Sequence, residues 1–443
     1  MLNMNKNLTL LLIVAAVITA ACCSNDTGRL DSSSLAGCFD NPEFARMMEE
    51  DPAFASLNHC PYYKVAGPFE YTKAPRGYKP FYISHYGRHG SRSGSQFDSY
   101  ERLIVTLSKA KNEGKLTSAG DRLLKQTAFV IERTDGMAGR LTVNGQKEHR
   151  EIAERMFRNF NGLFSGKKKV SVLSSEVPRC LVSMAAFTNH LCKLNRKLEI
   201  NIDCGSEIQK IIMNNSSAGI RKEVSERIDS LDRRQAKDYS VLLAKLFRSE
   251  ADAYSIVGDV EQFVNDIYST AEIAGAFDPD TCMMAILPLE LRYALARKNN
   301  VKIYLRQCNS LDYGDERMRL AAPLARNIVE HADSALAGNG IVADLRFGHD
   351  WPLLAISSLI GLEGVGERYS LEECSRHFIT TLNAPFAGNL QIIFYRSSDK
   401  DSPVLVKCLL NEKERRLIGL ESDHEPFYKW ADLKERLLSY TPI

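Results

Sequence analysis

Two hydrophobic periodicities alternate along the first half of the chain. Residues 79–84 form a compact aromatic and β-branched run that ends in a glycine-rich turn at Gly87, which predicts a strand, a loop and then a helix. Residues 141–157 carry apolar side chains at helical spacing behind Thr142, a residue type that caps helices. A second strand at 169–174 and a second helix at 180–194 follow.

The middle of the chain breaks this rhythm. Between about residues 204 and 308 the sequence shows long helical patterns in place of strands, which predicts a helical insertion. The rhythm then returns, with a helix at 317–336, a strand at 341–347, a helix at 353–362, strands at 389–395 and 404–410, and a closing helix at 430–438. We therefore predict an α/β fold, a mostly parallel central sheet flanked by helices, with an inserted α-helical domain.

The first residues have the pattern of an export signal. Lys6 precedes an apolar or small stretch from Leu8 to Ala21, and the chain then turns polar. Cys22 follows Thr19-Ala20-Ala21, as at a lipoprotein cleavage site, although Thr19 stands where a Leu is usual. We expect periplasmic or outer-membrane localisation in a Gram-negative bacterium, with a membrane tether through lipidated Cys22; plain secretion is the alternative. The predicted division is a signal peptide at 1–22, a leader at 23–70, an α/β core at 71–203 and 309–443, and the insertion at 204–308.

Composition narrows the possible partners. Lys and Arg total 57 against 55 for Asp and Glu, so no global field gathers nucleic acid or an anionic membrane. The eleven cysteines form no CxxC pair that would indicate structural zinc. Cys38 and Cys60 are candidates for a disulfide after export, and small buried hydrophobes are the alternative for most cysteines. Because positive and negative charges nearly balance over the whole chain, any preference for anions must be local.

One local cluster meets that requirement. Arg88-His89-Gly90-Ser91-Arg92 places an imidazole between two guanidinium groups, directly behind the first predicted strand. Two fixed cations depress the pKa of a histidine and keep it neutral and nucleophilic, and the same cations form a fork for phosphoryl oxygens. Taken alone, such a triplet is more often a structural histidine beside solvated arginines.

Two further segments change that interpretation. Arg179 follows the second predicted strand, and His349-Asp350 follows a later one. Parallel strands bring their carboxyl ends to one edge of a sheet, so the three segments should meet there. The sequence therefore predicts a phosphoryl-transfer site at this edge.

At these positions the chain resembles the branch of the histidine phosphatase superfamily that contains acid phosphatases, phytases and multiple inositol polyphosphate phosphatases. Arg88, His89, Gly90 and Arg92 match the Arg-His-Gly-x-Arg motif, and His349-Asp350 matches the His-Asp pair. Leu141-Thr142 with Gly145 resembles the family's helix start. Animal inositol polyphosphate phosphatases have His-Ala-Glu where this chain, like phytases and acid phosphatases, has His-Asp.

The resemblance implies a role for each residue. His89 becomes the nucleophile of a phosphohistidine intermediate, and Asp350 becomes the proton donor. The phosphoryl oxygens are held by Arg88, Arg92, Arg179 and His349. No cofactor or metal is required, and the expected partner is a small phosphorylated substrate, phytate or another inositol polyphosphate. A general acid must hold its proton, so we expect burial against Trp351 to raise the pKa of Asp350, opposed by the nearby cations.

Three alternatives stay open. A metal phosphohydrolase of the HD type would use His85, His89 and the His349-Asp350 pair, although in that class the pair lies within a helix. A non-catalytic lipoprotein that binds a phosphorylated ligand would use the same fold. Within the phosphatases, a broad-specificity or sugar-phosphate acid phosphatase is the alternative to an inositol polyphosphate phosphatase. His85 itself is expected to be an ordinary strand histidine.

Overall fold

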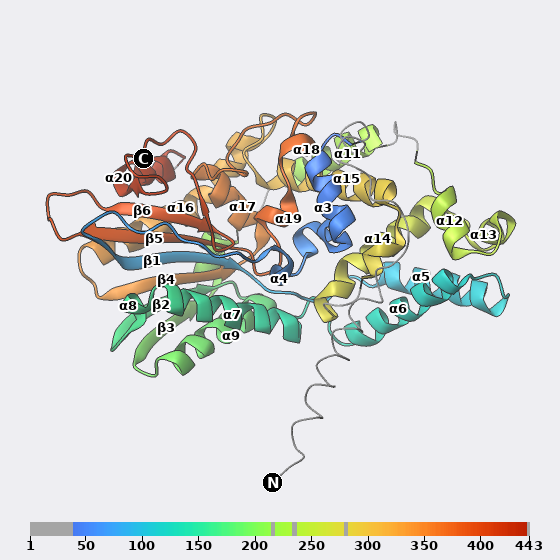
Figure 1. Cartoon of the computed structure of the whole chain (residues 1–443), viewed down its shortest axis with the longest axis horizontal. Helices are drawn as coiled ribbons and strands as arrows, with labels where there is room; N and C mark the ends of the chain where they lie inside the picture. Colours follow the sequence, from blue (N-terminus) through green and yellow to red (C-terminus); the bar gives the residue numbers. More distant parts are fainter. Residues whose placement is uncertain (1–38, 214–217, 233–236, 279–281, 441–443) are drawn as a thin grey trace, which may run out of the picture. The chain divides into compact units, whose positions relative to one another are not determined.

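The structure, a computed structural model, describes residues 39–213, 218–232, 237–278 and 282–440. By its internal packing the chain divides into residues 1–42 and residues 43–443, and the fold is that of the second unit. Its centre is an eight-stranded sheet with the order β3-β2-β4-β1-β5-β6-β7, in which β8 also pairs with β6 (Figure 1). The strands are β1 (Tyr78–Arg88), β2 (Lys168–Ser174), β3 (Leu198–Cys204), β4 (Ile341–Gly348), β5 (Asn389–Ser397), β6 (Leu405–Leu410), β7 (Lys413–Arg415) and β8 (Tyr428–Lys429).

Strand direction divides the sheet into two parts. Strands β3, β2, β4 and β1 run parallel to one another, whereas β5, β6 and the short strands beyond them pair antiparallel. Arg88 lies opposite Gly348, and Ser174 lies opposite Phe347. The carboxyl ends of β1, β2 and β4 therefore meet at one edge, as the sequence predicts, and the predicted α/β class is confirmed.

Helices cover both faces of the sheet (Figure 1). On one face, α7 (Val143–Asn159), α8 (Asn161–Phe164) and α9 (Pro178–Leu194) pack Ile152, Phe164 and Phe187 against the inner strands. On the other, α16 (Gly314–Leu336), α17 (Asp350–Leu359) and α20 (Trp430–Leu438) contribute Ile328, Ile356 and Leu433 to a second core. Because helices cover both faces, the inner strands are almost continuously buried towards their carboxyl ends.

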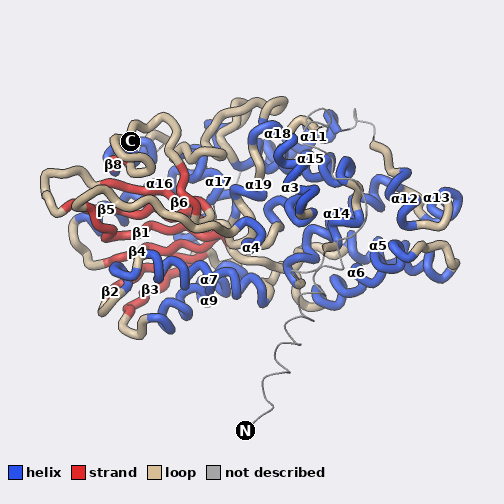
Figure 2. Tube along the Cα trace, in the orientation of Figure 1, coloured by secondary structure: helices blue, strands red, loops and turns tan. Residues whose placement is uncertain are grey.

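Most of the remaining helices lie beside the sheet (Figure 2), although Ile212 and Tyr304, from the segment between β3 and β4, contribute to the second core. Between β3 and β4 the structure describes α10 (Ser206–Ile212), α11 (Ala218–Asp232), α12 (Ser240–Leu246), α13 (Glu250–Ile256), α14 (Val260–Phe277), η2 (Met283–Ile286) and α15 (Leu289–Gln307). Helices α5 (Asp98–Asn112) and α6 (Ser118–Thr134) pack against α14, although they precede the predicted insertion. The short helices α18 (Cys374–His377) and α19 (Thr380–Asn383) precede β5. The predicted domain boundaries themselves stay a prediction.

The predicted leader is helical where the structure describes it. It contains α3 (Pro42–Glu50), η1 (Pro52–His59) and α4 (Tyr62–Val65), and η1 packs against α14, α15 and α19. Cys60, just behind η1, is a buried free thiol, and Cys38 lies outside the described residues. The predicted signal peptide and Cys22 lie outside them as well. Across the described ranges, no helix combines the length and apolar character needed to span a bilayer.

Candidate active site

The loop that carries His89 begins directly at the end of β1. The strand extends to Arg88, four residues beyond the predicted end, because His85 and Gly87 are accommodated in the middle of the sheet. A Cβ on Gly87 would approach the His85 ring to 2.7 Å, so Gly87 serves close packing and not a turn. The His89 amide donates to the Gly348 carbonyl (2.9 Å), and its carbonyl accepts from the Ala387 amide (3.0 Å), which holds the loop from both sides.

A pair of glycines brings helix α7 against this loop. A Cβ on Gly90 would lie 2.5 Å from the Gly145 carbonyl oxygen, and one on Gly145 would lie 2.3 Å from that of Ser91. Thr142 caps the helix by accepting from the Gly145 amide, as predicted. Glu148, one turn later, accepts from the amide and the hydroxyl of Ser91, both at 2.7 Å. The loop that carries His89 is therefore fixed to the first turns of α7.

His89 is buried and has one defined free nitrogen. Its Nδ1 lies 3.0 Å from the Gly90 carbonyl oxygen, so Nδ1 carries the proton and donates, and Nε2 keeps its lone pair. Burial, reinforced by the charges of Arg88, Arg92 and Arg179, holds the pKa of His89 well below its usual value. The imidazole is therefore neutral and nucleophilic at Nε2.

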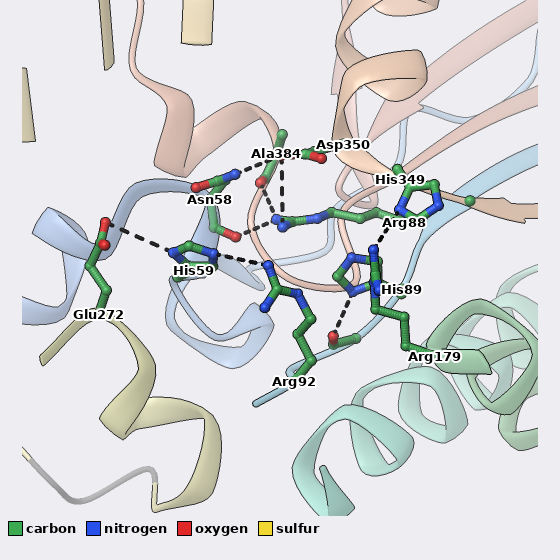
Figure 3. Close-up of polar contacts among 12 residues, drawn as sticks. Asn58, His59, Arg88, His89, Arg92, Arg179, Glu272, His349, Asp350 and Ala384 are labelled. Atoms are coloured by element: carbon green, nitrogen blue, oxygen red, sulfur yellow. Dashed lines mark hydrogen bonds and ion pairs between the residues drawn. The ribbon is translucent and has the colours of Figure 1, made fainter. Parts of the chain in front are cut away.

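Three arginines lie around the His89 ring (Figure 3). Arg88, at the end of β1, is 1% exposed and donates Nη1 to the carbonyls of Ala384 (2.9 Å) and Asn58. Arg92, in the loop, donates Nη1 to the Ser93 carbonyl (2.8 Å). Arg179 lies in the first turn of α9, directly after β2. All three predicted cations meet at the sheet edge.

His349 lies across from His89. The two rings are edge to face with centroids 5.5 Å apart, and the His349 ring stacks on Trp351 at 4.3 Å. Its Nδ1 is 3.5 Å from Arg179 Nη2, and its amide donates to the Tyr86 hydroxyl (3.0 Å). Burial and the charge of Arg179 lower the pKa of His349 to about 3, so this ring is also neutral.

Asp350 is the first residue of α17, three residues before the predicted start of that helix. Its Oδ2 accepts from Asn58 Nδ2 at 2.6 Å and lies 3.8 Å from Arg88 Nη2. Burial raises the pKa of this carboxyl, but Arg88, the Asn58 hydrogen bond and His349 outweigh it, so the net shift is downward. The expected rise is therefore wrong for the free site. Trp351 stacks on His349 instead.

Several residues of the site were not predicted. Asn58 and His59 come from η1 in the leader, and Glu272 comes from α14 (Figure 3). Their segments carry no motif, and the weak periodicity of the leader hid the short helix that presents the first two. Glu148 had a clearer signal, because it lies one turn into the helix whose start, Leu141-Thr142 with Gly145, resembles the family's helix start.

A metal centre of the HD type finds no geometric support in the described ranges, where no three His, Cys, Asp or Glu side chains gather as ligands. His85 lies away from His349-Asp350, between Phe187 and Phe347. His349 and Asp350 stand at a strand end and a helix start, not inside a helix. His85 is the strand histidine that the sequence predicts.

Solved structures define the class of fold. A Bifidobacterium longum multiple inositol polyphosphate phosphatase without ligand superposes with a TM-score of 0.69, 17% identity, and coverage of 86% of this chain and 97% of that one. A phytase from D. castellii superposes with a TM-score of 0.63, 12% identity, and coverage of 89% and 86%. The chain therefore has the histidine acid phosphatase fold.

Curated sequences give more particular relatives. Human multiple inositol polyphosphate phosphatase 1 is 23% identical over 388 residues, 78% of this chain and 76% of its own length. The chicken protein of the same name is 22% identical over 325 residues, 67% and 68% of the two chains. No protein-family model matches the chain. The predicted resemblance is confirmed, and both relatives are phosphatases, in agreement with the predicted enzyme class.

Proposed function

We propose that the protein hydrolyses phosphomonoesters through a phosphohistidine intermediate on His89. The observation that carries the proposal is the fixed tautomer of that ring, with Nδ1 bound to the Gly90 carbonyl and Nε2 free, on a ring whose pKa is lowered by burial and by three nearby arginines. A neutral imidazole attacks phosphorus without first losing a proton, and the surrounding guanidinium groups offset the charge of the transferring phosphoryl group.

In the first step, the Nε2 lone pair forms the N–P bond as the bond between phosphorus and the ester oxygen breaks. The departing alkoxide takes a proton from Asp350, because alkoxides leave poorly without one. Arg88, Arg92, Arg179 and His349 hold the phosphoryl oxygens. Asp350 is ionised in the free site, so it acquires its proton when an anionic phosphate enters and raises its pKa, at acidic pH from the phosphate monoanion itself.

In the second step, water attacks phosphorus and the N–P bond breaks. Asp350, now ionised, takes the proton of the attacking water, and inorganic phosphate leaves. The group that acts as acid in one half of the reaction thus acts as base in the other. The cations serve both steps because the phosphoryl group stays in place.

Inositol polyphosphates are the substrate class that we propose. Both curated relatives are named for them, and a Bifidobacterium structure holding inositol hexasulfate shares this fold at a TM-score of 0.64. The His349-Asp350 pair is the feature that keeps a broader acid phosphatase as the second candidate, since the sequence differs there from the animal enzymes.

We also propose that the protein is exported and tethered through lipidated Cys22. The support is the amino-terminal sequence alone, and globomycin-sensitive processing in cells labelled with palmitate would test it. The wild-type chain should carry the label, and Cys22→Ser should not. An unlabelled wild-type chain would contradict the tether.

The test of the main proposal uses purified protein and phytate. We expect phosphate release that exceeds the rate on a sugar phosphate panel and that survives EDTA, since Arg88, Arg92 and Arg179 supply the needed charge. An alkaline denaturing quench during turnover of a labelled substrate should trap a phosphoprotein that is stable in base and loses its label in acid. Label on a serine, or activity lost in EDTA and restored by zinc, would overturn the proposal. Equal rates across the panel would favour the broad phosphatase.

A further inference from the structure

We propose that the Asn58-His59 dipeptide of η1 is a positioning element of the active site: Asn58 orients the proton donor Asp350, and His59 orients the phosphate-binding Arg92. The inference rests on the proposed function. It gives the predicted leader a part in catalysis, although neither Asn58 nor His59 belongs to a recognisable sequence motif. Both residues act through others, and neither is placed in contact with the reacting atoms.

Asn58 touches both members of an ion pair. Its Nδ2 donates to Asp350 Oδ2 at 2.6 Å, and its main-chain carbonyl accepts from Arg88 Nη1. Arg88 Nη2 in turn lies 3.8 Å from the same Asp350 oxygen. One residue therefore fixes the distance between the carboxylate and the arginine, in a place where Arg88 is 1% and Asp350 is 5% exposed.

The local backbone is shaped for this contact. Leu57, immediately before Asn58, has φ 51° and ψ −120°, a conformation that side-chain-bearing residues rarely adopt. This kink interrupts η1 and is held by the complete burial of Leu57. A strained residue next to a group that contacts two site residues indicates that the direction of Asn58 is specified by the fold.

The hydrogen bond from Asn58 determines which oxygen of Asp350 can carry the proton for the leaving group. Because Oδ2 is engaged by Asn58 and faces Arg88, the proton that reaches the leaving group is carried on Oδ1. The groups that face this carboxyl are Arg88 from β1, His349 beside it in the chain, and Asn58 from η1. Of these three residues, Asn58 lies in η1 and is not one of the proposed phosphate-binding groups, so its side chain can be changed without altering the phosphate-binding charges.

His59 makes the matching contact at the other end of the site (Figure 3). Its Nε2 lies 3.5 Å from Arg92 Nη2, and its Nδ1 lies 3.8 Å from Glu272 Oε1. Arg92 can only donate, so Nε2 accepts and the proton sits on Nδ1, toward Glu272. Burial lowers the pKa of His59, which agrees with the neutral form that this arrangement needs. The ring also packs on Phe386 at 5.4 Å.

The Asn58 test compares two leaving groups. Asn58→Leu should slow kcat on an inositol phosphate by about 10-fold to 100-fold and on nitrophenyl phosphate by less than about 3-fold, because only the alkoxide needs a well-placed acid. Loss of the donor should also move the alkaline limb of the pH profile up by about one to two units. Asn58→Asp, which keeps the volume but replaces the donor with an acceptor, should be impaired at least as much.

A matched control makes the result specific. Asn112→Leu is the same substitution at an exposed position at the end of α5, and it should leave kcat, KM and the pH profile unchanged. Thermal unfolding of every variant reports whether the fold is intact. Equal losses on both leaving groups with an unmoved pH limb, or wild-type behaviour of Asn58→Asp, would overturn the role of Asn58.

The His59 test uses rescue by a conservative variant. His59→Phe keeps the packing on Phe386 but removes the acceptor, and it should raise KM by about 10-fold on both leaving groups alike, because the phosphate fork is disturbed and the acid is not. His59→Gln places an amide oxygen near the position of Nε2 and should recover most of the loss. A loss that depends on the leaving group, or no difference between Phe and Gln, contradicts the role of His59.

Failure of the inference is distinguishable from failure of the proposed function. If the wild-type protein releases no phosphate and forms no phosphohistidine, the proposed function is wrong. If wild type is active and the variants behave like Asn112→Leu, the reaction stands and the dipeptide is only part of the scaffold.

Discussion

The fold contains two pairs of buried histidines that differ in what surrounds them. His89 and His349 stand at the sheet edge among arginines, whereas His85 and His149 lie deeper, on the face covered by α7 and α9. Burial lowers the pKa of His85 and of His149 to about 3, much as it does for His349. A depressed pKa alone therefore does not distinguish a catalytic histidine from a structural one.

Direction and charge make the distinction. Rings of Phe187 and Phe347 flank His85 at 5.4 and 5.5 Å, and its Nδ1 has no hydrogen-bond partner among the residues that the structure describes. His89 instead donates from Nδ1 to the Gly90 carbonyl, and the charges of three arginines lower the pKa of its ring. Apolar burial makes a histidine neutral, but only an oriented ring beside fixed positive charge can accept a phosphoryl group.

The largest expected effect is a loss of turnover on substitution of His89, the proposed nucleophile. His89→Ala should abolish turnover with the fold intact, since it removes the covalent route but deletes only a loop side chain. His85→Leu should leave kcat within about 3-fold of wild type, because no reacting group touches that ring. Steady-state rates with circular dichroism as the folding control check both. Substantial turnover by His89→Ala would mean that another residue carries the phosphoryl group.

The next largest effect is expected on the rates of a variant at Asp350, the residue beside His349 at the sheet edge. Asp350→Asn should slow an alkyl phosphate by about 10²-fold to 10⁴-fold and an activated aryl phosphate much less, because nitrophenolate leaves largely unaided. Both substrates are measured on the same variant. Equal losses would assign Asp350 to orienting the phosphate or the loop, and the proton donor would have to be another group.

The smallest effect concerns the structural pair and stability. The folded-state pKa of His85 is about 3, below the unfolded value near 6.5, so the unfolded chain takes up the proton first as pH falls. The free energy of unfolding should therefore decrease between about pH 6.5 and pH 3. His85→Leu should reduce that slope by up to about 1.4 kcal/mol per pH unit, measured by urea unfolding from pH 4.5 to 7. Parallel curves for the two proteins would contradict the assignment.

The core of the fold was predictable because its signals are local. The strands predicted at 79–84, 169–174, 341–347, 389–395 and 404–410 correspond to β1, β2, β4, β5 and β6. Their buried runs on a two-sided sheet are nearly continuous, and the motif residues follow them at once. Strand β3 was missed although Leu198, Ile200 and Ile202 alternate with polar residues, the pattern of an edge strand exposed on one side.

The rest of the site was not predictable, for reasons of chain separation. Asn58 meets Asp350 across 292 positions, and His59 meets Glu272 through a helix of the predicted insertion. Neither contact leaves a periodic or motif signal, because each is made by the packing of η1 against α14 and α19. The same packing contributed to the unexpected direction of the Asp350 pKa shift, because the Asn58 hydrogen bond, which the sequence does not reveal, lowers the pKa together with the charge of Arg88.

The hydrogen bond between Asn58 and Asp350 joins residues 292 positions apart, which has a consequence for the order of events in synthesis and folding. During synthesis from the amino terminus, the His89 loop and the three arginines emerge long before Asp350, the proposed proton donor. Asp350 then pairs with Asn58, which was synthesised near the start of the chain. Contacts of such sequence separation form late in folding, because the loop that they close is long. Full acid-assisted turnover should therefore be among the last native properties to appear on refolding, after the sheet has formed.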